Sequence, residues 1–170
     1  SEKTEKDRAA YEAALAKADE LYSQEDYESA MIAYSEALRF WPDGEHAKAR
    51  LGSINEIRAL QRAQEEAYTN TISLADKLFA EKNYEGAKSE YRKASEIKPF
   101  ELYPKVRTGE IDMLLAEIRG KLEQYDGIII GADKLFNVGD YSEARIQYLK
   151  AQEILSDRTY PEDQIRMIDE

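Results

Sequence analysis

Apolar and small residues recur at helical spacing along the chain. In the stretch from Tyr68 to about Ala80 they fall three and four residues apart, which places them on one face of an α-helix. After the turn "EKN", a second helix of the same kind runs from about Tyr84 to Ile97, where Pro99 ends it. The pattern predicts a helical hairpin in which alanines let the helices cross closely and tyrosines fill the space beside them.

The hairpin pattern occurs three times at a fixed interval of 57 residues, without insertion or deletion. Repetition at one interval is typical of proteins built from stacked copies of a supersecondary unit. Matching positions include Tyr11/Tyr68/Tyr125, Ala18/Ala75/Ala132, Asp19/Asp76/Asp133, Leu21/Leu78/Leu135, Tyr34/Tyr91/Tyr148 and Ile54/Ile111/Ile168.

The order of residues in each unit resembles that of a tetratricopeptide repeat. A small residue precedes a large apolar one, and a turn of Gly, Asn or Asp before Tyr is followed by Ala, an aromatic residue, Ala and Pro. The second unit shows this order at Ala75, Leu78, Asn83, Tyr84, Ala87, Tyr91, Ala94 and Pro99. The third unit has Ser156 in place of the proline, and the tryptophan usual near the hairpin start is replaced by Ala14, Thr71 and Ile128. The resemblance implies a protein that binds other proteins.

The chain departs from that family in the 23 residues that follow each unit, because tetratricopeptide units normally succeed one another about every 34 residues. The insert 102–124 starts with Tyr103-Pro104, which suits a helix start, and continues into the next hairpin without a stop. We expect one helix over about 105–137, about 50 Å long, which first covers the preceding hairpin and then becomes the first helix of the next. A matching helix is expected over about 46–80.

The predicted fold class is therefore all-α, with three tetratricopeptide-like hairpins joined by long shared helices in an extended α-solenoid or rod. The incomplete last insert leads us to expect that the natural chain continues within a larger protein. The domain assignment is one repeat domain, 1–170, made of units 11–44, 68–101 and 125–158, helical inserts 45–67 and 102–124, and a truncated insert 159–170.

Composition and charge narrow the possible partners. The chain is 42% hydrophobic and 35% charged, which fits a folded, helix-rich protein, and no apolar run approaches the roughly 20 residues of a membrane span. The net charge is −11, and residues 11–44 carry eight acids against two bases. This charge opposes binding to nucleic acid or anionic lipid and favours a basic protein or peptide, unless it only keeps the surface solvated. We expect no direct membrane insertion.

The residues offer little for catalysis or metal binding. His46 is the single histidine and there is no cysteine, so a nucleophile with its base, or an ordinary zinc site, cannot be assembled. No calcium-loop pattern and no glycine-rich phosphate loop after a strand is present. We therefore expect no enzyme activity, no catalytic residues, no cofactor and no metal.

Candidate partner-binding residues come from the resemblance, which places the first helix of each hairpin on the ligand-binding side of the family. Trp41 is added because it differs from its equivalents, Lys98 and Leu155. The candidates are Asp19, Tyr22, Trp41, Ile72, Asp76, Phe79, Ile129, Asp133 and Phe136. An alternative is that the three aspartates serve the repeat itself by accepting a hydrogen bond across the hairpin. Trp41 then covers a hairpin end, and Ile129 packs under the following unit.

Two functional hypotheses remain. The first is a scaffold for protein–protein interaction, with a peptide or partner helix lying along the first helices of the hairpins. The alternative is a structural spacer or self-associating rod, including a homodimer. The Tyr-Pro-linked repeats also resemble parts of bacterial envelope proteins, which implies a periplasmic rather than a cytoplasmic location.

Overall fold

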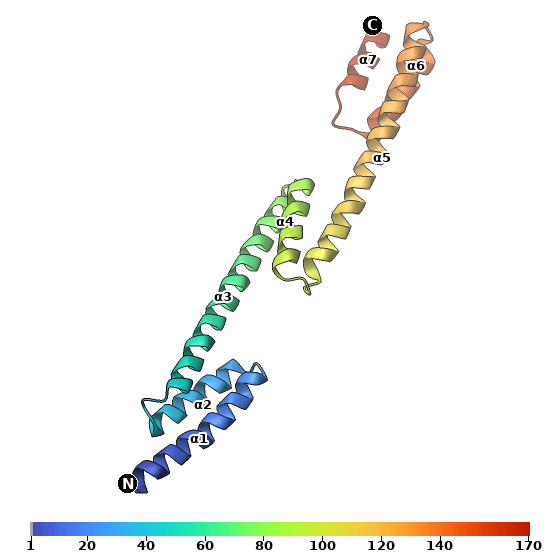
Figure 1. Ribbon diagram of the computed structural model, residues 1–170. Coiled ribbons are helices and arrows are strands. Elements are labelled where there is room, and N and C mark those ends of the chain that lie inside the picture. The colour runs from blue at the N-terminus through green and yellow to red at the C-terminus, as the bar shows by residue number, and fades with distance from the viewer. Residues whose placement is uncertain (1) are drawn as a thin grey trace. The chain divides into compact units, whose positions relative to one another are not determined.

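The computed structural model describes residues 2–170, with side chains from Thr4 on, and in this part of the chain there are seven α-helices and no strand (Figure 1). The helices are α1 (Glu2–Ser23), α2 (Tyr27–Phe40), α3 (Glu45–Ala80), α4 (Tyr84–Ile97), α5 (Tyr103–Asn137), α6 (Tyr141–Ile154) and α7 (Tyr160–Asp169). The all-α prediction is confirmed. The two long helices run without interruption, and α5 begins two residues before its expected start.

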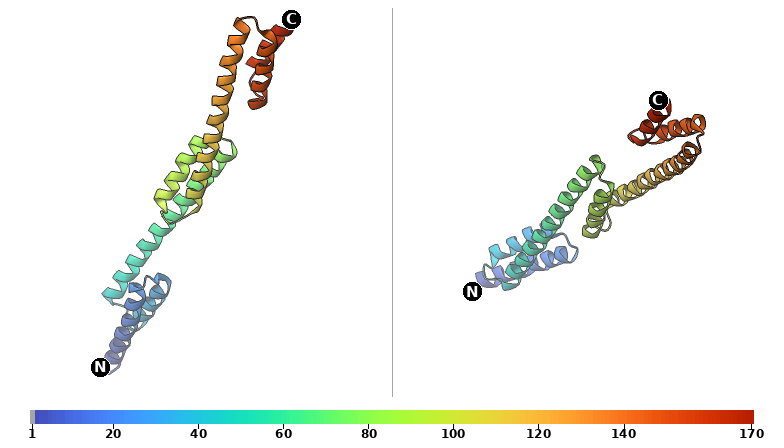
Figure 2. Two further views of the ribbon diagram at one scale, coloured as in Figure 1. Left: turned by 90° about the vertical axis from the view of Figure 1, so that its right-hand side faces the viewer. Right: turned by 90° about the horizontal axis from the view of Figure 1, so that it is seen from above.

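The chain divides into two compact units, Ser1–Asn70 and Thr71–Glu170. The first contains the antiparallel pair α1 and α2 and most of α3. The second contains the end of α3 with α4 to α7. Within the second unit, α4 packs against the first part of α5 and α6 against its last part, and α7 packs on α6 (Figure 2). In the described residues 2–170, no helix combines the length and the apolar character that crossing a bilayer requires.

Each hairpin turn uses one residue to end the first helix and begin the second. In the second hairpin the N–H of Asn83 donates to the carbonyl of Leu78 at 2.8 Å, which closes the first helix. The side chain of Asn83 then accepts from the N–H of Gly86 at 3.0 Å, which caps the second helix. Asp26 and Asp140 do the same in the other two hairpins. The polar residue that the sequence places before each tyrosine is therefore required by both helix ends.

The residue before this cap has a left-handed backbone in all three turns. It is Glu25 with φ 60°, Lys82 with φ 62° and Gly139 with φ 83°. Only the third unit fills the position with the residue that adopts this conformation without steric strain.

Replacing Lys82 by glycine is expected to stabilise the second unit by about 0.5–1 kcal/mol, because the relief of strain exceeds the added freedom of the unfolded chain. Urea denaturation followed by circular dichroism measures the change. The matched control is Gly139→Ala, which removes the glycine from the equivalent position of the third unit. It is expected to lower stability by about 1 kcal/mol. A destabilised Lys82→Gly variant would contradict the assignment of strain to this turn.

The cores consist of small and aromatic residues at repeating positions. The alanine of the first helix and the alanines and tyrosine of the second are fully buried in every hairpin, so the predicted packing pattern is confirmed. These residues are Ala18, Ala30, Tyr34, Ala37, Ala75, Ala87, Tyr91, Ala94, Ala132, Ala144, Tyr148 and Ala151.

The start of the following helix completes each core, as expected from the inserts. Pro104 and Ile111 of α5 are fully buried against the second hairpin, and Pro161 of α7 is buried in the equivalent place on the third. A proline fits there because the first N–H groups of a helix have no partner inside the helix. In the first unit Ala47 takes the position of the proline, and Ile54 is fully buried. The packed repeat thus contains three helices rather than two.

Candidate partner-binding residues

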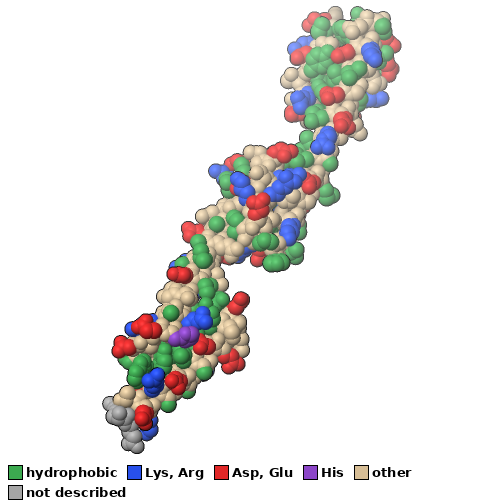
Figure 3. Space-filling view, viewed as in Figure 1, with side chains coloured by type: hydrophobic (Ala, Val, Ile, Leu, Met, Phe, Trp, Pro, Cys, Tyr) green, Lys and Arg blue, Asp and Glu red, His purple; other side chains and the backbone are tan. Residues whose placement is uncertain are grey.

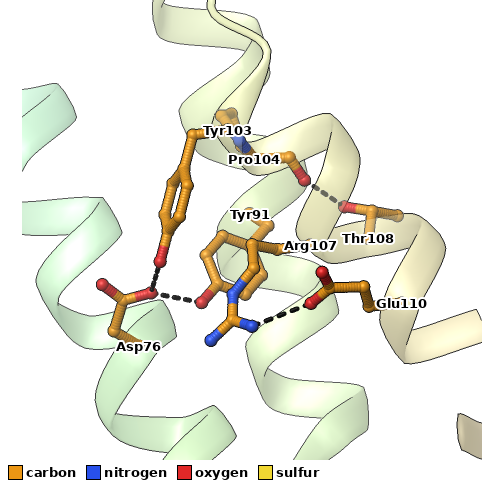
Figure 4. A network of polar contacts seen from close by, with 7 residues as sticks. All are labelled: Asp76, Tyr91, Tyr103, Pro104, Arg107, Thr108 and Glu110. Carbon is orange, nitrogen blue, oxygen red and sulfur yellow. Dashed lines mark hydrogen bonds and ion pairs between the residues drawn. The ribbon is translucent and has the colours of Figure 1, made fainter.

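The repeated aspartate lies where three helices meet. In the second hairpin Asp76 of α3 accepts a hydrogen bond from the hydroxyl of Tyr91 on α4 and another, at 2.8 Å, from the hydroxyl of Tyr103 at the start of α5 (Figure 4). One carboxylate oxygen accepts both bonds, so the first helix is tied to the second and to the third at a single point. Nearby, the hydroxyl of Thr108 donates to the carbonyl of Pro104 at 2.8 Å within the first turns of α5.

The same arrangement occurs in the other two hairpins. Asp133 accepts from Tyr148 at 2.5 Å and from Tyr160 at 2.9 Å. Asp19 accepts from Tyr34, and Nε2 of His46 lies 2.8 Å from the same oxygen. The single histidine therefore takes the place that tyrosine has in the other repeats, at the start of the third helix.

Burial and the neighbouring carboxylates keep the phenols at these junctions protonated. Burial, and then the hydrogen bond to the Asp133 carboxylate, raise the pKa of Tyr148 to about 12. The same causes raise the pKa of Tyr34 and of Tyr91. Partial burial acts to raise the pKa of Asp19, but hydrogen bonds from Tyr34 and His46 outweigh it, so the pKa lies below its ordinary value. At neutral pH the tyrosines therefore remain donors.

The aromatic candidates also contact their own chain. The guanidinium of Arg107 on α5 lies 4.0 Å from the centroid of the Phe79 ring, and that of Arg50 on α3 lies 4.3 Å from the Tyr22 ring. These are cation–π contacts between the third helix and the end of the first. Phe136 instead meets the edge of Tyr141, with ring centroids 5.3 Å apart.

The remaining candidates lie at the margins of the cores. Ile72 and Ile129 pack against the buried residues of the second and third hairpins. The N–H of Trp41 donates to the carbonyl of Ala37 at the end of α2, and the guanidinium of Arg8 lies 6.0 Å from the Trp41 ring. All nine candidates are half-buried. Each one thus contributes to the repeat, and the three aspartates make the cross-hairpin hydrogen bond that the alternative interpretation requires.

The sequence reasoning missed an exposed apolar surface in the second unit. It consists of Phe100, Leu102, Val106 and Met113, which we call the outer α5 face. The exposed fractions of these side chains are 97%, 72%, 56% and 76%. Figure 3 shows hydrophobic side chains at the surface beside the connection between α4 and α5. Val106 and Met113 lie on the side of α5 opposite the buried Ile111, because their helical spacing places them about half a turn away from it, and Phe100 and Leu102 lie in the connection just before α5.

This face could have been found by comparing residues that lie 57 positions apart in the sequence. The first repeat has Asp43, Glu45, Ala49 and Glu56 at these positions, and the third has Asp157, Thr159, Asp163 and Glu170. Only the second repeat is apolar at all four positions. The conspicuous matches between the repeats drew attention to what the fold requires, whereas the differences between them identify what it does not require.

The described residues contain no group of three or more His, Asp or Glu side chains placed to hold a metal ion. Comparison with models of known protein families and with curated proteins finds no match to this chain. The likeness to tetratricopeptide repeats therefore rests on the residue pattern given above.

Proposed function

We propose that the chain is a non-catalytic, tetratricopeptide-like scaffold that binds protein or peptide partners. The observation that carries this proposal is the distribution of exposed apolar side chains. Among the described residues, the first unit exposes three large ones, Ile32, Phe40 and Leu60, whereas the second unit exposes fourteen. The second unit is less than one and a half times as long as the first, so length does not account for the difference. Exposed apolar side chains that form a patch are typical of protein–protein interaction sites, and four of the fourteen belong to the outer α5 face.

The hydrogen bonds between the repeated polar residues support the same function. The repeated aspartates and tyrosines, which are the most regular polar groups, bond to one another inside each repeat. They stabilise the scaffold and leave recognition to residues that differ between repeats. A peptide lying along the first helices would have to compete with α3, α5 and α7 for those groups, so an outer surface is favoured.

The test is a selection of displayed helical peptides against the intact chain, followed by hydrogen exchange with and without the selected peptide. We expect binders that protect residues in 71–170 from exchange. Failure to select any binder, or protection confined to residues 4–70, would contradict a scaffold that binds through its second unit. Helical content, measured in parallel, shows that the chain remains folded under the conditions of the selection.

The second candidate function is a structural spacer or self-associating module. The observation that favours it is the stretch 59–67 of α3, in which every residue is exposed. An exposed stretch of helix of this length is typical of a spacer segment. Light scattering over a range of concentrations tests self-association, and a dimer that survives dilution would favour this function.

A further inference from the structure

The middle of α5 lies between the two packed cores that this helix joins. Along α5, the core of the second hairpin extends as far as Leu115, and residues of the third hairpin's core begin again at Ile129. Of the residues 116–124, seven are exposed, and Gly120 and Leu122 are half-buried. Figure 1 shows this middle part of α5 between the ends that α4 and α6 cover. Its helical state therefore depends mainly on local propensity, because tertiary packing contributes little there.

The equivalent stretch of α3, residues 59–67, is also exposed but has a different composition. Its sequence is ALQRAQEEA, and all nine residues belong to the strongest helix formers. Alanine and straight-chain residues lose little conformational freedom in a helix, so such a sequence stays helical with little help from packing. Local propensity is therefore high where α3 has no packing.

In α5 the same positions carry two residues that weaken a helix. The sequence of 116–124 is AEIRGKLEQ, in which Ile118 takes the place of Gln61 and Gly120 the place of Ala63. Glycine gains the most backbone freedom when a helix opens, and a β-branched side chain is restricted inside a helix. The unpacked stretch of α5 is therefore less stable as a helix than the unpacked stretch of α3.

Packing does not account for the glycine at position 120. A Cβ added to Gly120 would meet nothing within 4 Å, so no neighbouring group requires the small residue. The residue lies inside α5, where alanine adopts the same backbone conformation without strain. The loss of helix stability at Gly120 is therefore not offset by closer packing.

One ion pair spans the glycine and reduces this loss in part. Nζ of Lys121 lies 3.5 Å from Oε1 of Glu117, and both side chains are more than half exposed. A glutamate four residues before a lysine supports a helix, but an exposed pair contributes less than the replacement of alanine by glycine costs. The weak point in α5 therefore remains.

We propose that α5 bends by local opening of the helix within 116–124, with Gly120 as the hinge residue, so that the second and third hairpins change their relative orientation. The cores of both hairpins persist during this motion, because the buried residues Ile111 and Tyr125 lie outside the opened stretch. The inference concerns a movement within the second unit and does not depend on the proposed scaffold function.

Hydrogen exchange of the intact chain tests the local opening. We expect the amides of 116–124 to exchange about fivefold more slowly in Gly120→Ala than in the wild type, the factor that corresponds to the difference in helix propensity. Gly109→Ala is the matched control, because a Cβ at Gly109 also meets nothing within 4 Å but the residue lies in the packed part of α5. This control is expected to leave exchange in 116–124 unchanged.

The converse substitution, Ala63→Gly, is expected to speed exchange in 59–67 about fivefold. Equal exchange of 116–124 in the wild type and in Gly120→Ala, or an equal effect of Gly109→Ala on that stretch, would overturn the assignment of the weak point to Gly120. Circular dichroism shows whether each variant keeps its helical content.

Spin labels measure the bending itself. The chain has no cysteine, so Ser89→Cys on α4 and Lys150→Cys on α6, both exposed, provide two unique attachment sites. We expect a broad distribution of distances between the labels, which narrows when Gly120→Ala is added. Labels at Lys77→Cys and Ser89→Cys, within one hairpin, give the breadth due to the labels alone. A wild-type distribution no broader than this control, or one that Gly120→Ala leaves unchanged, would overturn the hinge.

Discussion

Replacing Tyr91 by alanine is expected to lower the free energy of unfolding of the second unit by about 3–5 kcal/mol, the range for removal of a fully buried aromatic side chain. Tyr91 is fully buried between the crossing helices of the hairpin, and the alanines around it are too small to fill the space that it would leave. Its hydroxyl also donates to Asp76, so the substitution removes one of the two bonds that tie the three helices together. Urea denaturation of the intact chain measures the effect.

The Tyr91→Phe variant separates the two contributions. It keeps the ring and removes only the hydroxyl, so we expect a loss of about 1.5–3 kcal/mol, as for other hydrogen bonds to a charged group. Tyr103→Phe is a matched control, because it removes the other donor to Asp76 from a side chain that is exposed and can be replaced by water. If the alanine and phenylalanine variants were equally destabilised, burial of the ring would not be the main stabilising contribution.

Replacing Ile111 by alanine is expected to cost about 2–5 kcal/mol, because a fully buried apolar side chain leaves a cavity between α5 and the hairpin. The residue lies in the insert that tetratricopeptide units lack, so this substitution tests whether the third helix belongs to the folded repeat. Hydrogen exchange should show faster opening of α4 together with the first turns of α5.

Met113→Ala is the control for Ile111→Ala, since Met113 lies two residues away on the same helix and is mostly exposed. Its effect is expected to stay within about 0.5 kcal/mol, as is usual at the surface. An Ile111→Ala variant no less stable than Met113→Ala would show that α5 only extends from the hairpin and does not complete its core.

Most of the fold could be predicted because the chain contains three copies of the unit, so that equivalent positions can be compared with one another. A position that is alanine in all three units, such as Ala87, must be small for the helices to cross. Pro104 marked the start of a helix, and the lack of any stop before Asn137 indicated its length. The start of α5 at Tyr103 was missed by two residues, because helix ends depend on local hydrogen bonds that periodicity does not reveal.

The candidate site was harder to predict. The spacing of Asp76 and Tyr91 shows that both lie within a hairpin, but not that a third helix brings Tyr103 to the same oxygen. That contact depends on how α5 folds back on α4, which no local pattern encodes. Conversely, the outer α5 face differs from its equivalents in the sequence, yet its exposure follows only once Ile111 is known to be the buried side.

The cap residues Asn83, Asp26 and Asp140 have a consequence for how such a chain lengthens in evolution. Because each of them ends one helix and begins the next, a break or a join in a gene at these turns would disrupt both helices at once. The exposed stretch 59–67 has no such constraint. A join placed within such an exposed helical stretch would leave the hairpin turns, with their two-sided caps, intact.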